Sequence, residues 1–164
     1  MGVLGRLSTA TLLALSLPGL VACNGIPGAE SGDVAAQRPS STVSGFVVDD
    51  AIDGASINVY AFDNGIQGEL LASTTTGLDG AYEIELDSLE QRPLLIEARG
   101  GSYVELATAK QISLKDDEVL RAVTIYQPGQ PISLMVTPLT HLVAALVEYQ
   151  TSTGKSVGQA IADA

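Results

Sequence analysis

Cysteine, aromatic residues and basic residues are scarce in this 164-residue chain. Its single cysteine excludes an internal disulfide and a zinc site of several thiolates. Tryptophan is absent and aromatic residues make up 4% of the chain, so few large rings are available to stack on a sugar or to anchor a peptide. Because 8 basic residues face 19 acidic ones, the net charge is −11. Such a surface repels nucleic-acid backbones, and we expect no nucleic-acid partner.

Aliphatic residues, in contrast, are plentiful. Hydrophobic residues account for 46% of the chain, enough for a core built from valine, isoleucine, leucine and alanine. The length suits one domain with small appendages. The composition therefore predicts a single folded domain with an aliphatic core.

The first 22 residues have the layout of a secretory signal peptide. One basic side chain, Arg6, precedes an apolar stretch over 7–17, and Pro18-Gly19 then interrupts any helix. The apolar stretch is too short to span a bilayer comfortably. We therefore predict that residues 1–22 are a signal peptide.

The residues that follow the break are Leu20-Val21-Ala22-Cys23, and they resemble the bacterial lipobox. The resemblance implies that the signal peptidase recognises Leu20, Val21 and Ala22 and cleaves before Cys23. It also implies that diacylglycerol is attached to the Cys23 sulfur and that the new amine is acylated, with palmitate as a typical chain. A thiol is nucleophilic enough for this alkylation, and each buried methylene of an acyl chain adds ~0.8 kcal/mol of membrane affinity. The alternative is an ordinary signal peptide with a coincidental cysteine.

Asn24 bears on the destination of the chain. In lipoproteins with this motif, aspartate after the lipidated cysteine favours retention in the inner membrane, so Asn24 implies the outer membrane of a host that has two membranes. Residues 23–41 are rich in glycine, proline, serine and alanine and have no hydrophobic periodicity, which is typical of a flexible linker. We expect a cell-envelope protein whose membrane contact is the lipid on Cys23.

From Thr42 onward, apolar and polar residues alternate, as is typical of half-buried strands. The alternation is clearest over 82–87, where Tyr82, Ile84 and Leu86 share one face. Expected strands lie at 43–48, 55–62, 69–76, 81–87, 93–99, 103–112, 119–126 and 132–136. Asp79-Gly80 is expected to close a hairpin, because glycine accepts positive φ. The sequence predicts a mainly β fold, with residues 42–136 forming an antiparallel Greek-key β-sandwich of about seven strands.

Three segments of this region carry a family resemblance. They are Val43-Ser-Gly45-Phe-Val47-Val-Asp49, Asp53-Gly54-Ala55-Ser-Ile57-Asn-Val59-Tyr60 and Thr76-Gly-Leu-Asp79-Gly80-Ala-Tyr82. Together they resemble the carboxypeptidase regulatory-like domain, a transthyretin-like Greek-key sandwich, over about residues 42–110. The family's usual proline before the second segment is missing, and Ile52-Asp53 stands there. Because that domain is non-catalytic, the resemblance implies no enzyme activity, no catalytic residues and no cofactor.

Residues 137–164 are predicted to form one or two short α-helices. Thr137 is a good N-cap and Pro138 is tolerated in the first turn. Apolar residues recur at helical spacing after them, and we expect this broad face to pack against the sandwich or an absent partner: Leu139, Leu142, Val143, Leu146 and Tyr149. Ser156 and Gln159 resemble a capping box that opens a second helix. Because that helix is barely two turns long, the chain is alternatively a piece of a longer protein.

Motifs for nucleotide and zinc chemistry are incomplete. Gly154-Lys155-Ser156 lacks the first glycine of a phosphate loop, since Tyr149 stands at that position. His141 is the only histidine, and no second histidine or glutamate stands at the spacing of a metalloprotease helix. We expect His141 to be a partly buried helix residue and predict no zinc site.

Calcium is the remaining metal to consider. Residues 49–54 do not start an EF-hand, because Ala51 occupies the third position and Tyr60 the twelfth. A looser calcium site is an alternative if the loops that carry four aspartates converge. These are Asp49, Asp50, Asp53 and Asp79.

The sequence thus predicts a non-catalytic, lipid-anchored cell-envelope protein whose sandwich serves as a binding or spacer module. Its expected partners are the membrane, through Cys23, and an unknown envelope protein or glycan. One alternative is an accessory domain of a larger secreted enzyme or adhesin. The other is a calcium-dependent adhesion module.

Overall fold

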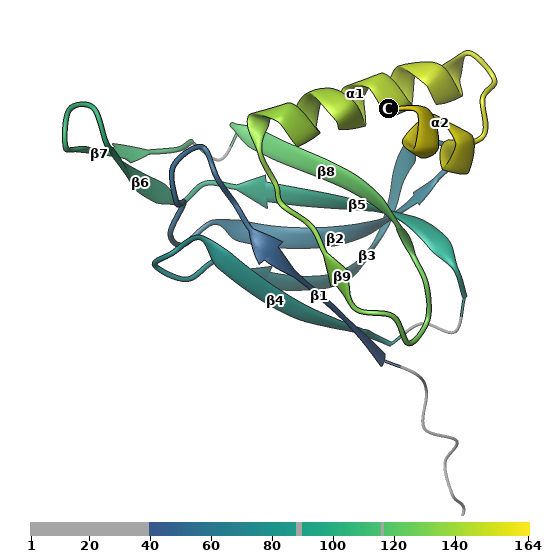
Figure 1. The fold of residues 1–164 in the computed structure, drawn as a ribbon, viewed down its shortest axis with the longest axis horizontal. Helices are drawn as coiled ribbons and strands as arrows, with labels where there is room; N and C mark the ends of the chain where they lie inside the picture. The colour runs from purple at the N-terminus through teal and green to yellow at the C-terminus, as the bar shows by residue number, and fades with distance from the viewer. Residues whose placement is uncertain (1–39, 88–89, 116) are drawn as a thin grey trace, which may run out of the picture. The chain divides into compact units, whose positions relative to one another are not determined.

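The computed structural model describes residues 40–87, 90–115 and 117–164. The predicted signal peptide, the recognition residues Leu20, Val21 and Ala22, the lipid attachment site Cys23 and Asn24 lie outside the described residues. The described part contains nine strands and two helices (Figure 1): β1 (Ser40–Phe46), β2 (Ser56–Asp63), β3 (Ile66–Thr75), β4 (Ala81–Asp87), β5 (Arg92–Arg99), β6 (Ser102–Glu105), β7 (Lys110–Ser113), β8 (Val119–Tyr126), β9 (Ile132–Ser133), α1 (Pro138–Ser152) and α2 (Val157–Asp163).

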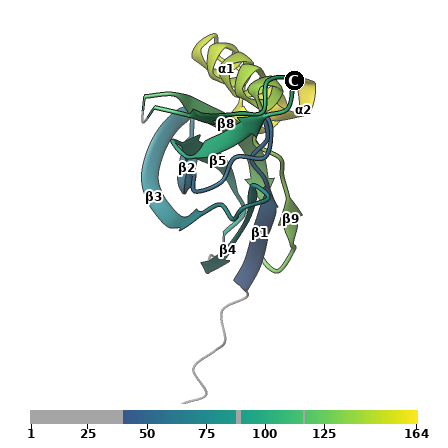
Figure 2. The same cartoon turned by 90° about the vertical axis from the view of Figure 1, so that its left-hand side faces the viewer.

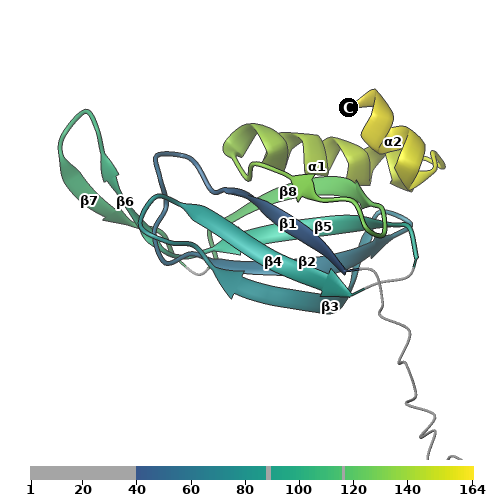
Figure 3. The ribbon, with the colours of Figure 1, turned by 60° about the horizontal axis from the view of Figure 1, so that its bottom comes forward.

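Seven of these strands form two sheets that face each other. One sheet has the strand order β4-β1-β9, and the other has the order β3-β2-β5-β8 (Figure 3). β9 pairs with β1 in parallel, and the other paired strands of the two sheets are antiparallel. The chain crosses between the sheets after β1, β3, β4 and β8. The predicted fold class, a mainly β Greek-key sandwich of about seven strands followed by short helices, is confirmed.

The main core lies between the two sheets. Val43 and Ile84 reach it from the three-stranded sheet, and Ile57 and Leu94 reach it from the four-stranded one. The alternation predicted for β4 is confirmed, because Tyr82, Ile84 and Leu86 are buried while the acidic residues between them are exposed. Burial also raises the pKa of the Tyr82 phenol.

A second core lies on the outer face of the four-stranded sheet, where the helices pack (Figure 2). Phe62, Leu95 and Val123 come from the sheet, and Ala144 and Val147 come from α1. Since β5 is covered on both faces, its residues 93–96 form a continuous apolar run rather than an alternating pattern. The helix start is confirmed as well: the Thr137 hydroxyl accepts a hydrogen bond from the backbone of Thr140, and Pro138 occupies the first turn.

The expected strand over 103–112 is wrong in one respect. It is two short strands, β6 and β7, that pair with each other around a turn in which Ala109 takes a φ of 56°. The backbone N–H of Ala109 donates to the carbonyl of Glu105 at 2.8 Å and closes the turn. No glycine or proline marks this turn, and the alternation continues across it, so the pattern gave no signal of a break.

The expected hairpin at Asp79-Gly80 is also wrong, although the turn itself is present. Gly80 has a φ of 74°, and the Asp79 carboxylate accepts a hydrogen bond from the Ala81 N–H at 3.1 Å. However, β3 pairs with β2 and β4 pairs with β1, so the turn carries the chain from one sheet to the other. Both ends of the turn are fixed by hydrogen bonds to the loop before β2, and these hold the two strands apart.

The three-stranded sheet begins at Ser40, within the stretch expected to be a linker, and Ser40 lies opposite Asp87. The expected strand at 132–136 is the short β9, followed by an isolated bridge between Val47 and Val136. No helix in the part of the chain that the structure describes is long and apolar enough to cross a membrane.

Candidate functional site

Three segments meet at one end of the sandwich. They are the β1–β2 loop (47–55), the β3–β4 turn (76–80) and the segment around the β6–β7 hairpin (101–115), and we call this region the loop end. Asp53 and Ser102 exchange two backbone hydrogen bonds of 2.8 and 2.9 Å, which joins the first segment to the third. The Gly54 N–H donates to the Thr76 carbonyl at 3.2 Å, which joins the first to the second. The loops therefore form one assembled surface.

Thr76 joins two loops of the loop end through buried hydrogen bonds. Its residue is 5% exposed, and its hydroxyl donates to the Ile52 carbonyl at 2.6 Å. The same oxygen accepts the Ala55 N–H at 2.9 Å, and the Thr76 N–H donates to the Ala55 carbonyl at 2.9 Å. A buried hydroxyl thus satisfies one acceptor and one donor of a neighbouring loop. Sequence reasoning placed Thr76 in a family pattern but did not find this role.

Two leucines stand exposed at the tips of the loop end. Leu78 is 87% exposed and Leu106 is 86% exposed, and Val104 on β6 is 56% exposed. With Asp50 and Ala51, these side chains line one hollow of about 320 Å³. Leu78 and Leu106 come from segments far apart in the sequence, so their meeting in one hollow is a product of the fold. Apolar groups gathered in this way are typical of an interaction surface.

A groove lies on the other side of the β6–β7 hairpin and has a volume of about 520 Å³. Apolar and charged side chains both line it, among them Asp49, Tyr103, Lys115, Glu118 and Leu120. Partial burial, followed by the carboxylates of Asp49 and Glu105, raises the pKa of the Tyr103 phenol. The Lys115 N–H donates to the Glu118 carboxylate at 2.9 Å, which fixes the backbone before β8. The groove can therefore accept a ligand segment with both apolar and polar groups.

The four aspartates proposed for calcium do not form a metal site. In the described residues, no group of three or more histidine, cysteine, aspartate or glutamate side chains could hold a metal ion. Asp79 uses its carboxylate to fix the β3–β4 turn, while Asp53 lies in the backbone bridge to Ser102. Asp49 and Asp50 line different hollows. The hypothesis of a calcium site at these residues is therefore wrong.

The other candidate residues, His141 and Gly154-Lys155-Ser156, belong to the helical C-terminal part of the chain. His141 is partly buried on α1, as predicted. Gly154-Lys155-Ser156 lies in the turn between α1 and α2, and the Lys155 ammonium pairs with Asp163 at 2.9 Å. No strand leads into this turn, so it lacks the surroundings of a phosphate loop.

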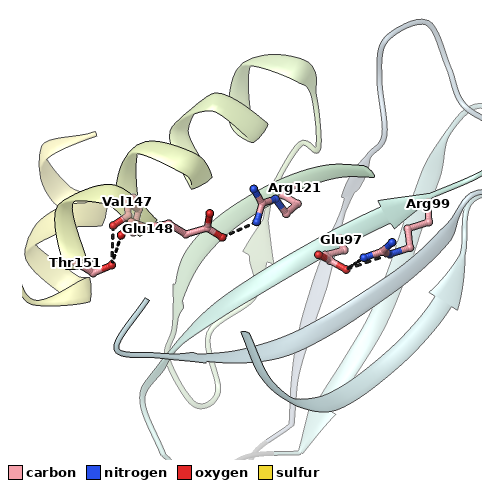
Figure 4. A network of polar contacts seen from close by, with 6 residues as sticks. All are labelled: Glu97, Arg99, Arg121, Val147, Glu148 and Thr151. Atoms are coloured by element: carbon pink, nitrogen blue, oxygen red, sulfur yellow. Dashed lines mark hydrogen bonds and ion pairs between the residues drawn. The ribbon is translucent and has the colours of Figure 1, made fainter. Parts of the chain in front are cut away.

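Charged side chains form a row on the outer face of the four-stranded sheet (Figure 4). The Glu97 side chain is 4% exposed and accepts hydrogen bonds from Arg99 at 2.8 and 3.2 Å. The hydrogen bonds that the Arg99 guanidinium donates to the Glu97 carboxylate raise the pKa of Arg99. On the neighbouring strand, Arg121 lies opposite Glu97 and donates to Glu148 of α1 at 2.5 Å. The Arg121–Glu148 pair fastens α1 to the sheet, whereas the Glu97–Arg99 pair lies within β5.

Comparisons with known proteins give limited likenesses. No protein-family model and no curated protein matches the chain. A DUF3823 family protein from Parabacteroides merdae overlays with a TM-score of 0.35 and 13% identity, covering 61% of this chain and 46% of that one. The chain thus spans less than half of that protein's length. A proposed carbohydrate-binding protein from Pseudomonas aeruginosa gives a TM-score of 0.39 and 12% identity, covering 62% and 90%.

The third comparison is a 9R-lipoxygenase from Cyanothece, with a TM-score of 0.41 and 12% identity over 76% of this chain and 24% of that one. All three TM-scores and identities are low. These likenesses therefore carry no information about what this chain binds.

Proposed function

We propose that the chain is a non-catalytic binding module of the cell envelope, anchored by lipid at Cys23 and binding an envelope protein at the loop end. The observation that carries the proposal is the convergence of Leu78, Val104 and Leu106 on one hollow. Burying apolar surface contributes roughly 25 cal/mol per Å². The resemblance to the carboxypeptidase regulatory-like domain agrees with a non-catalytic role.

The side chains at the loop end favour a protein over a glycan. Leu78, Val104 and Leu106 are aliphatic and fit the apolar pockets of a protein partner. Glycans are held by flat aromatic rings and dense hydrogen bonding. Tyr103 lines the groove, and the residues that line the hollow include no aromatic side chain. The mixed lining of the neighbouring groove extends the same surface with polar contacts.

The direction of β1 supports partner binding at the loop end. β1 starts at Ser40, at the far end of the sandwich, and its last residue, Phe46, leads directly into the loop end. At about 3.3 Å per residue, its seven residues separate the two ends by ~20 Å. A chain tethered at Cys23 therefore enters the sandwich at the end opposite to the loop end.

The anchoring part of the proposal predicts the mass of the mature chain. We expect wild-type chains from membranes to lack residues 1–22 and to carry the added mass of acyl chains at Cys23. Cys23→Ala should lose that mass and leave the membrane fraction, since alanine has no thiol to alkylate. Asn24→Asp is the matched control and should keep the lipid while moving the chain to the inner membrane. Intact-mass spectrometry decides, and an unmodified wild-type chain, or one cleaved elsewhere, contradicts the anchoring.

The binding part predicts site-specific crosslinking. Photoreactive benzoylphenylalanine in place of Leu78 or Leu106, in the full chain in its native envelope, should give protein adducts of one shared mass. The same probe at Ile66, which is 70% exposed at the opposite end of the sheet, should not give that adduct. Adding Leu78→Ser to the probe at position 106 should reduce the adduct at least ~10-fold, because one buried leucine contributes ~1.5–3 kcal/mol. If protease digestion leaves the added mass of the partner intact on the probe-bearing peptide, the partner is a glycan instead. If no adduct forms, binding at the loop end is contradicted.

A further inference from the structure

The outward face of α1 is apolar. Leu139, Leu142 and Tyr149 are 65–70% exposed and Leu146 is 42% exposed, and we call these four residues the leucine stripe. Of the apolar residues expected to share one packed face, Val143 alone is placed against the second core. A surface helix usually shows the opposite arrangement, with its leucines turned to the core. The leucine stripe is therefore an apolar surface that a binding partner could bury.

The packing of α1 prevents it from burying the stripe by rotating. Small side chains, Ala144 and Val147, allow the helix to lie close to the sheet, and both are fully buried. Glu148 points from α1 toward Arg121 of β8 and pairs with it at 2.5 Å (Figure 4). The imidazole Nδ1 of His141 is also shielded from solvent. Turning the leucines inward would break the ion pair and expose Val147.

We infer that the leucine stripe is the contact surface of a symmetric dimer, in which α1 of a second copy of this chain lies antiparallel along it. The stripe residues are spaced by three, four and three positions, which is the repeat of a helix–helix seam. A second copy supplies the same repeat. A twofold axis sets Leu142 against Leu146 of the second copy and Leu139 against Tyr149 of the second copy.

The distribution of charge favours a second copy over a lipid surface. The exposed residues of α1 are uncharged: Pro138, Leu139, Leu142, Leu146, Tyr149 and Ser152. Two copies that each carry a net charge of −11 repel each other elsewhere, so an uncharged face is where they can approach. Helices that lie on membranes carry lysine and arginine beside their apolar face, and α1 contains neither.

The size of the stripe sets the strength of the dimer. Four exposed side chains on each copy give roughly 1,000 Å² of buried surface in total, at the lower end of specific interfaces. The dimer should therefore dissociate on dilution. Salt should strengthen it, because screening weakens the repulsion between the acidic copies. The inference does not rest on the proposed function at the loop end.

Photocrosslinking in the native envelope tests the dimer before detergent can cover the stripe. Benzoylphenylalanine in place of Leu139 in the full chain should yield an adduct of two copies of this chain. Leu142→Glu, at a 65% exposed position, should reduce that adduct at least tenfold without changing the melting temperature of the chain at dilutions where it is a monomer. Leu106→Glu, which places the same charge at the loop end, should leave it unchanged. A wild-type chain that forms no self-adduct, or that crosslinks to lipid or to another protein, overturns the inference.

Paired variants test the antiparallel arrangement. When two differently tagged full chains are co-expressed, Leu142→Glu with Leu146→Lys should restore the mixed adduct, because the new opposite charges face each other. Leu142→Glu with Leu142→Lys should not restore it, because each new charge then faces a leucine. Restoration by the second pair alone would overturn the antiparallel arrangement.

Discussion

Alanine in place of Gly45 is expected to lower the free energy of unfolding by about 3 kcal/mol or more. A Cβ at this position would lie 1.8 Å from the carbonyl oxygen of Leu134 and 3.1 Å from the Tyr82 hydroxyl. The Tyr82 hydroxyl donates to that same carbonyl at 2.7 Å. The carbonyl cannot retreat freely, because the Leu134 N–H donates to Ser44 at 2.9 Å. The added methyl therefore has to separate β1 from the segment after β9.

Urea unfolding measures this effect, and α2 offers a matched control. A Cβ at Gly158 would meet no atom within 4 Å, so Gly158→Ala should raise stability by about 0.5–1 kcal/mol through helix propensity. The two variants add the same methyl and should move the urea midpoint in opposite directions. A Gly45→Ala protein as stable as the wild type would show that the backbone of Leu134 does not approach Gly45 this closely.

Valine in place of Thr76 is expected to lower the free energy of unfolding by about 2–4 kcal/mol. Valine keeps the shape of threonine but leaves the Ile52 carbonyl and the Ala55 N–H without their buried partner. Because the hydroxyl fastens the β1–β2 loop to the β3–β4 turn, Thr76→Val should also speed amide hydrogen exchange at Ala55. The benzoylphenylalanine probe at position 78 should also lose its partner adduct, although Thr76 is not among the residues that line the hollow.

Thr76→Ser separates the hydroxyl from the methyl group. Serine retains both hydrogen bonds, so Thr76→Ser should keep the slow exchange of Ala55 and most of the stability. Urea unfolding and hydrogen exchange on the three proteins give the comparison. If serine and valine had equal effects, the packing of the methyl group, and not the hydroxyl, would hold the loops together.

The sequence predicts the bounds of β4 and β8. β4 matches the predicted bounds because Tyr82, Ile84 and Leu86 alternate with charged residues, and β8 matches over 119–126. Pairing between strands is less predictable, since alternation is a local property. The crossing between β3 and β4 depends on hydrogen bonds between Thr76 and residues more than 20 positions away.

The orientation of α1 could not be predicted from its apolar spacing. Hydrophobicity alone predicts that Leu142 and Leu146 face the core, yet the buried residues of α1 are Ala144 and Val147. The ion pair between Glu148 and Arg121 needs a strand position that only the fold provides. The leucines at the loop tips were missed for a related reason: a single apolar residue in a turn carries no periodic signal. The candidate site was therefore predictable only as a set of loops rich in aspartate.

The position of β1 between β4 and β9 has a mechanical consequence. Tension between a membrane tether and a partner held at the loop end would act along the length of β1, which starts at Ser40 and ends at the loop end. The hydrogen bonds of β1 to β4 run across the strand, so such a pull loads them in shear and all at once. Failure then requires several bonds to break together, whereas a pull across the strand would open them one after another. The entry of the chain through a central strand thus makes the domain resist force along the axis on which it would be pulled.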